Sequence, residues 1–479
     1  MEKNTPGPAC GPVDRTRIAL PRVLNLWDVV MIVIGGVIGS GIFLSPSEIA
    51  TAVPFPAVML AVWVVGGLLS LFGAVAFAEL GAALPEAGGI YIYLREAYGP
   101  LISFLFGWTL FLVIDSGSIA TLAVAFSFNM LPRFVEMSKL EKNLIAAAFV
   151  AFLGAVNYVG VRWGSRLQNL LTYIKTGAIG IIVTAVFFFA KVKGHPVNFV
   201  QPAPASFDLG LLGAFGVGLV ASLWAYKGWE AATYSAGEVK DPRRNLPLGI
   251  LIGTMAVIVI YVIANLAYLY ILPVDKIASS EGRVALDVMQ VVSGPFGASL
   301  IAFLILFSIL GAANQNMLCS PRVYFAMARD GLFFKKIAEC HPRFLTPHVS
   351  IIAISAWSIF LTLTGTFKQL FTYVIFGEWI FFGLTVAAVI VLRRKRPDLD
   401  RPYRTWGYPV TPALFVLAAL YVAFSSLLSA FRNAMFGLGI ICLGIPAYLY
   451  WRHRDGRPGP ASGERAAAPG KTDGGGGGR

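Results

Sequence analysis

The residues best suited to bind a small charged molecule lie in a glycine-rich stretch inside the first long apolar run, 27–52. Gly35, Gly36, Gly39 and Gly41 fall within seven residues. Glycine in a helix interior is less favourable than alanine by about 1 kcal/mol. Glycine also lets a helix break and lets backbone approach a neighbouring helix closely. The spacing therefore indicates either a broken helix or a packing face.

A break at membrane depth exposes backbone N–H and C=O groups, and this is tolerated only where the backbone lines a cavity or a ligand. Freed N–H groups can hold a carboxylate, and freed C=O groups can hold an ammonium. This interpretation predicts a substrate site at Ile38, Gly39, Ser40 and Gly41. The alternative is helix packing, because Gly35 and Gly39 have the GxxxG spacing.

A second interruption lies in the apolar run 209–237, where aromatic and charged residues surround a glycine. Two interrupted spans at corresponding positions of a chain point to a repeat with a binding site between them. Three aromatic side chains near a break favour the wall of a pocket over simple core packing. The predicted site residues here are Trp224, Ala225, Tyr226, Lys227, Gly228 and Trp229.

Five further polar residues within apolar runs are candidates for coupling or gating, because burying ionisable groups in a bilayer is costly. We expect Lys227 to pair with Glu378 first and Asp115 second, since a lone buried charge costs too much. If Lys227 instead reads the substrate, the substrate carries an anionic side chain. Asn314 is expected to bond to the first span or to Lys175, or to join helices. The five candidates are Lys175, Asn314, Glu378, Asp115 and Glu230.

Composition places these residues in an all-α polytopic membrane protein. The 479 residues are 57% hydrophobic and 13% charged, whereas soluble domains carry about 25% charged residues. The net charge of +13 lies in short connections, which argues against nucleic-acid binding. We expect about twelve transmembrane helices, at 27–52, 54–83, 100–131, 143–163, 166–190, 209–237, 247–272, 295–328, 349–365, 369–392, 410–428 and 433–451, with an amphipathic interfacial segment at 88–98.

The lysines and arginines of the connections predict the orientation. The N-terminal segment, the even-numbered connections and the C-terminal tail hold about 26 of them, and the odd-numbered connections hold 9. The positive-inside rule then places both termini in the cytoplasm. We expect a multi-pass protein of the inner cell membrane. The expected parts are a cytoplasmic tail 1–22, repeats 23–208 and 209–396, two further helices in 397–452, and a disordered cytoplasmic tail 453–479.

Four sequence blocks together resemble the amino acid–polyamine–organocation superfamily, and most closely bacterial relatives of the L-type amino-acid transporters. The similarity covers roughly residues 22–452. The blocks are Ile38–Phe43, Ala78–Gly81 with Pro85, Gly88 and Gly89, Leu223–Pro247, and Arg393–Pro409.

This resemblance implies a five-plus-five inverted repeat with broken helices 1 and 6 and two added spans. It also implies secondary transport of amino acids. In this family a lysine at the place of Lys175 occupies the position where sodium-coupled relatives hold an ion, so a fixed cation replaces a bound one. Lys227 and Glu230 depart from the family pattern, and Ala312 stands where relatives have a serine.

Cofactor, metal and partner expectations follow from the remaining residues. The four histidines lie in or near connections, so we expect no metal or haem centre, no cofactor and no enzyme. Animal relatives join a single-span subunit through a cysteine in the loop after span 3. The corresponding loop here, 132–142, has no cysteine, so we expect no disulfide-linked heavy subunit.

The sequence thus favours a sodium-independent amino-acid transporter that works by alternating access, as an exchanger or with proton coupling. The alternatives are a channel or a sensor on the same scaffold, or a transporter of polyamines or other organic cations.

Overall fold

The computed structural model describes residues 20–39, 41–193, 196–199, 206, 208–280, 283–364, 367–429 and 431–455. Ser40, the first nineteen residues of the predicted N-terminal tail and the predicted tail from residue 456 onward lie outside the described residues. Every extended element of the described chain is a helix, and one isolated bridge joins Leu24 to Val239.

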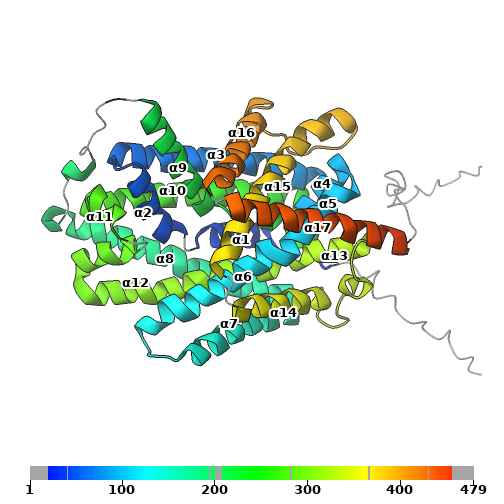
Figure 1. The fold of residues 1–479 in the computed structure, drawn as a ribbon, viewed down its shortest axis with the longest axis horizontal. Helices are drawn as coiled ribbons and strands as arrows, with labels where there is room; N and C mark the ends of the chain where they lie inside the picture. The colour runs from blue at the N-terminus through cyan, green and yellow to red at the C-terminus, as the bar shows by residue number, and fades with distance from the viewer. Residues whose placement is uncertain are drawn as a thin grey trace, which may run out of the picture.

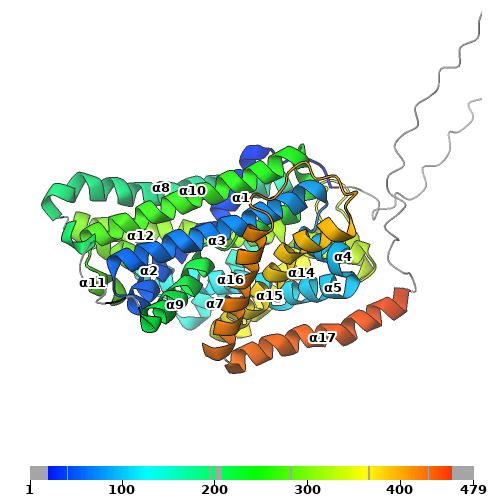
Figure 2. The same cartoon turned by 90° about the horizontal axis from the view of Figure 1, so that it is seen from above.

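The helices form one elongated bundle, with most axes along its long direction (Figures 1 and 2). Within the first part of the chain they are α1 (Leu26–Val37), α2 (Gly41–Ala52), α3 (Pro56–Ala83), α4 (Ile90–Tyr98), α5 (Pro100–Thr109), η1 (Leu110–Ile114), α6 (Asp115–Val124), η2 (Ala125–Met130), η3 (Leu131–Arg133), α7 (Lys139–Val159), α8 (Val161–Lys193) and η4 (Pro196–Phe199).

The second part continues the same bundle. It contains α9 (Leu209–Ala225), η5 (Trp229–Glu238), α10 (Pro242–Ile271), α11 (Val274–Ala278), α12 (Val284–Cys319), α13 (Pro321–Arg329), η6 (Lys335–Ala338), α14 (His348–Thr364), α15 (Phe367–Lys395), α16 (Val410–Ser429) and α17 (Phe431–Asp455).

Local sequence explains where several helices begin. Asn25 caps α1 through a reciprocal pair of hydrogen bonds with Asp28, and Ser138 caps α7 in the same way with Glu141. Proline stands in the first turn of α3, α5, α10 and α13, where its missing N–H costs no helical hydrogen bond.

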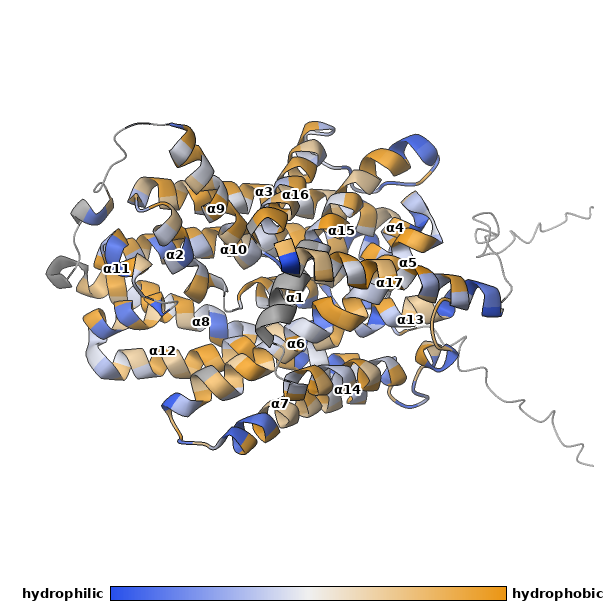
Figure 3. Ribbon diagram, viewed as in Figure 1, coloured by the Kyte–Doolittle hydropathy of each residue, from blue (hydrophilic) through white to orange (hydrophobic). Residues whose placement is uncertain are grey.

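The bundle is a polytopic membrane fold. Nine of the described helical segments are long and apolar enough to cross a membrane, and the pair α1–α2, bent by 43°, makes a tenth. Hydrophobic residues predominate along the helices, whereas hydrophilic residues are most frequent toward the two ends of the bundle (Figure 3). Each of the twelve predicted spans corresponds to one helix or to a run of consecutive helical segments, although α14 has only 17 residues.

The two ends of the bundle differ in the elements they carry. One end, the α13 side, has α4, α13 and the end of α17 (Figure 1). The start of α1 lies there too, because Leu24 bridges to Val239 beside α13. The opposite end, the α11 side, has α11 and the end of α2, which are in contact.

Two boundary predictions were wrong and one was confirmed. A helix does begin at Pro295, because Gly294 has a non-helical backbone conformation; it follows a shorter helix of α12 that starts at Val284. Helices α7 and α8 meet at Gly160 rather than after residue 163. The C-terminal helix continues to Asp455, beyond residue 453, where the tail was expected to begin.

The amphipathic segment at 88–98 is not a surface helix. Ile90, Tyr91, Tyr93 and Leu94 of α4 are completely buried. The helix packs against α5, α13 and α15, which supply the apolar partner that the sequence pattern assigned to the membrane interface.

Candidate functional site

Both predicted interruptions are real breaks in the helices. Helix α1 ends at Val37 and α2 begins at Gly41, while α9 ends at Ala225 and η5 begins at Trp229. The first turns of α2 and η5 therefore begin inside the bundle, where the leading N–H groups of a helix have no intrahelical acceptor. One break thus lies in predicted span 1 and the other in predicted span 6.

The two breaks touch each other through glycine backbone. A side chain on Gly228 would place its Cβ 2.7 Å from the carbonyl carbon of Gly36, and one on Gly41 would lie 2.8 Å from Cα of Ala225. Gly228 also has φ +124°, a conformation that side chains disfavour. The glycines therefore allow the two breaks to come into close backbone contact, in addition to allowing each helix to break.

Lys175 of α8 holds the first break. Its ammonium is completely buried and donates to the carbonyl oxygens of Gly35 at 2.6 Å, Ile38 at 2.7 Å and Ser308 at 3.4 Å. A lysine ammonium has three N–H donors, so these acceptors match it fully. Lys175 therefore links the broken first span to α12, the eighth span.

Ser308 of α12 completes this arrangement, and sequence reasoning missed it. Its hydroxyl donates to the carbonyl oxygens of Ile38 at 3.4 Å and Gly39 at 3.3 Å. Ser308 lies one turn before Ala312, the position where a serine was expected in relatives, and it supplies a hydroxyl to the break. The only available signal was a polar residue in the apolar run before Ala312.

Tyr261 of α10 joins the two breaks directly. Its hydroxyl lies 2.8 Å from the carbonyl oxygen of Val37 and 3.3 Å from that of Ala225, the last residues of α1 and α9. The C-terminal carbonyls of a helix lack intrahelical donors. Tyr261 satisfies one such group from each half-helix, and nothing in the sequence distinguished this tyrosine from others in apolar runs.

Asn314 does not contact the first span or Lys175, contrary to one of the two expectations. Its side chain bonds to Asn157 of α7 at 2.9 Å and to Gln168 of α8 at 2.8 Å. It also donates to the carbonyl of Gly164 at 3.2 Å. It faces α7 and α8, so it joins helices, as the alternative held. The neighbouring Gln315 reaches the second break and donates to the carbonyl of Gly228 at 3.0 Å.

Lys227 forms the predicted ion pair with Glu378. Its Nζ lies 2.8 Å from Glu378 Oε1, and the two side chains are 20% and 5% exposed. Asp115, the second expected partner, instead accepts a hydrogen bond from Ser320. Glu230 accepts from the backbone N–H of Gly228 at 2.9 Å, just across the break.

A cavity of 620 Å³ lies against both breaks. Gly39, Gly41, Lys227 and Glu230 line it, as do residues near the α11 side. The charged residues of that outer part are Glu48 and Arg283, both exposed.

Only part of the predicted aromatic wall faces this cavity. Trp224 lines it, but Tyr226 and Trp229 do not. Tyr226 packs edge-on against Trp63 and beside Tyr261, and Trp229 packs against Phe77 and Phe382. These two predictions were wrong because the aromatic residues on either side of Lys227 point into the helix packing. Of the other predicted site residues, Ala225 and Gly228 line the cavity and Ile38 does not.

Ion pairs close the bundle on the α13 side. Arg322 and Glu238 are both completely buried, with Nε–Oε2 at 2.7 Å and Nη2–Oε1 at 3.1 Å. Arg95 and Asp330 pair at 2.7 Å, and Tyr91 donates to the same carboxylate at 2.8 Å. Burial alone would lower the pKa of Arg95, but the facing Asp330 more than offsets this and raises it.

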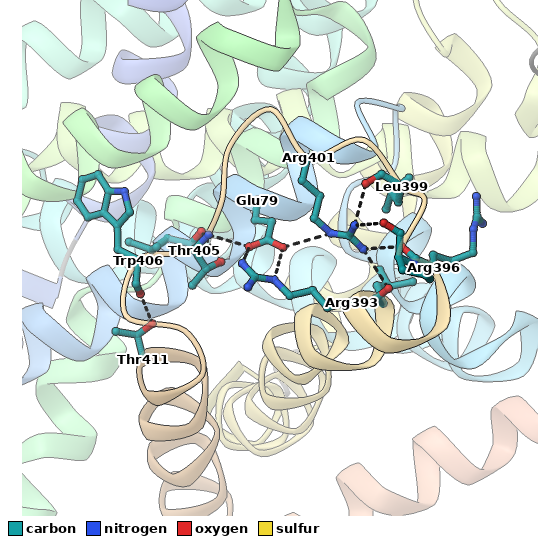
Figure 4. Close-up of polar contacts among 11 residues, drawn as sticks. Glu79, Arg393, Arg396, Leu399, Arg401, Thr405, Trp406 and Thr411 are labelled. Atoms are coloured by element: carbon teal, nitrogen blue, oxygen red, sulfur yellow. Dashed lines mark hydrogen bonds and ion pairs between the residues drawn. The ribbon is translucent and has the colours of Figure 1, made fainter.

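A third cluster on this side surrounds Glu79 at the end of α3 (Figure 4). Arg393 donates to both carboxylate oxygens at 2.9 and 2.6 Å, and the backbone N–H of Thr405 donates at 2.7 Å. Arg401 lies 3.5 Å away and also binds carbonyl groups at the end of α15, including those of Leu392 and Arg396. The cavity is thus open toward the α11 side and sealed toward the α13 side.

Comparison with known proteins supplies the relatives of this chain. Residues 24–445 match the model of the amino acid permease family. The b(0,+)-type amino acid transporter 1 of Mus musculus is 31% identical over 86% of this chain and 84% of its own length. The human cystine/glutamate transporter is 31% identical, over 93% and 88%. The large neutral amino acids transporter small subunit 2 of Mus musculus is 31% identical, over 94% and 86%.

Proposed function

Since this chain belongs to the amino acid permease family and is an amino-acid transporter rather than an enzyme, we propose that it works by alternating access and without sodium. The observation that carries this proposal is that the two helix breaks meet at the inner end of a cavity that opens only toward the α11 side. Such a site can be reached from the α11 side, while the ion pairs of the α13 side block passage. A continuous pore, the channel alternative, does not fit this arrangement.

The proposed substrate position follows from the first turn of α2. Free N–H groups and the positive end of the helix dipole favour a carboxylate beside Gly39 and Gly41. The carbonyls of Gly35, Val37, Ile38 and Gly39 already accept from protein donors, although each carbonyl oxygen has a second lone pair. The amino group is therefore expected nearer the second break.

Sodium independence rests on Lys175. A sodium ion at the first break would need the carbonyl oxygens that this ammonium already holds at 2.6 and 2.7 Å. A fixed cation with three matched donors removes both the space and the charge deficit that would attract the ion.

Orientation and repeat organisation are part of the same proposal. The excess of lysine and arginine on the α13 side supports a cytoplasmic location for that side, in an inner membrane with both termini inside. Helix α1 starts on the α13 side, whereas α9 starts on the α11 side (Figure 1). This reversal supports inverted repeats at 23–208 and 209–396, followed by the two helices in 397–452.

No disulfide-linked partner is proposed, although one relative is named a small subunit. The connection between η3 and α7 contains no cysteine that could form such a link. Electrophoresis of membranes without reducing agent tests this, and a larger species that reducing agent converts to the single chain would contradict it.

The function is tested with the purified full chain. A thermal-shift screen with the common L-amino acids identifies those that stabilise it, because a ligand that binds only the folded state raises its stability. Uptake of a stabilising amino acid into proteoliposomes is then compared in sodium and in choline buffer. We expect equal uptake, and a steep dependence on sodium would contradict the proposal. A rate that grows linearly with concentration without saturating would support a channel instead.

A further inference from the structure

Negative charge outnumbers positive charge where the second break meets the cavity. Lys227 interacts electrostatically with three carboxylates, from α15, α6 and its own segment. It is the only cation that faces them among the described residues. Those carboxylates are Glu378, Asp115 and Glu230, which are 3%, 5% and 3% exposed.

Three carboxylates that are shielded from water cannot all remain ionised against one ammonium. A further positive charge must be supplied by a metal ion, by an organic cation or by a proton. The described residues contain no group of three or more acidic, cysteine or histidine side chains suited to a metal. Lys227 already occupies one oxygen of Glu378 at 2.8 Å.

An organic cation such as the amino group of a bound substrate can approach the second break from the cavity, but it does not reach the interior of this cluster. Glu378 and Asp115 do not line the cavity, and Glu230 lines it with almost no exposed surface. A proton needs no such access. The cluster also contains the hydroxyl of Tyr324, which is completely buried, faces Asp115 and has no hydrogen-bond partner among the described residues.

Glu230 is the carboxylate best placed to take the proton. Glu378 holds Lys227 directly, and Asp115 accepts from Ser320. Glu230 alone lines the cavity, and it accepts from backbone N–H groups, its own and that of Gly228, rather than from a charged side chain. The titratable groups that face this cluster are Lys227, Tyr234, Glu378, Asp115 and Tyr324.

The bond to Gly228 would couple the proton to the shape of the site. An ionised carboxylate accepts a stronger hydrogen bond than a protonated one. Protonation of Glu230 therefore loosens Gly228, whose backbone lies directly against Gly36 of the other break. The charge of one side chain thereby affects the contact between the two half-helices.

We propose that Glu230 takes up one proton in each transport cycle, so that an amino acid and a proton move in the same direction. A hydronium ion of the cavity gives its proton to a Glu230 oxygen and leaves as water. When the site opens to the α13 side, the O–H bond breaks and water there receives the proton. This inference rests on the proposed transport of amino acids and adds the ion that drives it.

The test uses proteoliposomes of the full chain that contain the pH dye pyranine, with the membrane potential clamped by valinomycin and equal potassium. Each common L-amino acid is added outside in turn, and its uptake is measured together with acidification of the lumen. We expect acidification with every amino acid that enters. A pH difference of one unit stores about 1.4 kcal/mol per proton, which supports accumulation of up to about tenfold.

Glu230→Gln should remove the acidification per amino acid carried and abolish accumulation driven by the pH difference. Glu230→Asp, which keeps a carboxylate, should retain both and serves where the glutamine variant does not assemble. Glu48→Gln is the matched control, because Glu48 also lines the cavity but lies exposed at its outer part. Its proton-to-substrate ratio should equal that of the unmodified chain.

The outcomes separate the two proposals. Amino-acid uptake without acidification overturns the proton coupling and leaves the transport function standing. Acidification that persists in Glu230→Gln overturns the assignment to Glu230. Absence of uptake for every amino acid overturns the proposed function, and the proton coupling with it.

Discussion

Each of the two helix breaks is held by a lysine, but the two lysines are matched in different ways. Lys175 is completely buried, and its charge is stabilised by hydrogen bonds to backbone carbonyls, which are fixed in place by the main chain. Lys227 is 20% exposed and is neutralised by the side chain of Glu378, which can rotate away. The first break is therefore a fixed part of the scaffold, whereas the second contains charges that can rearrange or exchange a proton.

Lys175→Met tests the fixed side of this comparison and should have the largest effect. It removes a charged donor from three buried carbonyl groups, each such hydrogen bond being worth about 1.5–3 kcal/mol, although Ile38 keeps the bond from Ser308. We expect a loss of stability approaching about 5 kcal/mol or failure to recover folded protein, measured by thermal denaturation in detergent. Lys276→Met, at an exposed lysine of α11, is the control. A stability equal to that control would show that the first break needs no cation.

Lys227→Met tests the rearrangeable side. It strands the buried carboxylate of Glu378, so we expect a loss of about 3 kcal/mol. Adding Glu378→Gln should recover much of it, because removing both partners of a buried pair is often tolerated. The measurement is a double-mutant cycle of stability and uptake. If the double variant is no better than the single ones, and acidic amino acids lose affinity selectively, Lys227 reads the substrate instead.

Gly41→Val sharpens the comparison at the point where the breaks meet. The new Cβ would lie 2.8 Å from Cα of Ala225, so backbone must shift, at a cost of about 1–3 kcal/mol. We expect stabilisation by amino acids to disappear while folded protein is still recovered. Gly180→Val in α8 is the matched control, because its Cβ would meet no atom within 4 Å and Gly180 does not line the cavity. Equal ligand stabilisation in both variants would mean that Gly41 only packs helices.

Tyr261→Phe should have the smallest effect and acts on both breaks at once. It removes one hydroxyl that serves the ends of α1 and α9, and the expected loss is about 1 kcal/mol. Substrate affinity should fall more than stability, because the two half-helices lose their shared anchor. Tyr268→Phe is the control, since that buried hydroxyl has no hydrogen-bond partner among the described residues. An affinity unchanged relative to the control would contradict this role.

The features that could be predicted from the sequence are those in which a residue type is energetically unfavourable at its position in an apolar run. Glycines in an apolar run and a lysine in the middle of a span are costly without a compensating contact, so the two breaks, Lys175 and the Lys227–Glu378 pair could be anticipated. Ser308 and Tyr261 could not, because neither is costly where it stands and only the folded helices bring it to a carbonyl. Hydropathy likewise shows that Tyr226, Trp229 and the apolar face of α4 avoid water, but it does not show which protein surface or lipid covers them.

The bonds of Ser308 also bear on how the chain is made. The carbonyl of Ile38 receives that hydroxyl from a residue 270 positions later. A ribosome adds about 5–20 residues each second. The first helix pair therefore waits roughly 15–50 seconds after its synthesis before its break can be completed, and during that time the open carbonyls must be served by water, by lipid head groups or by the insertion machinery.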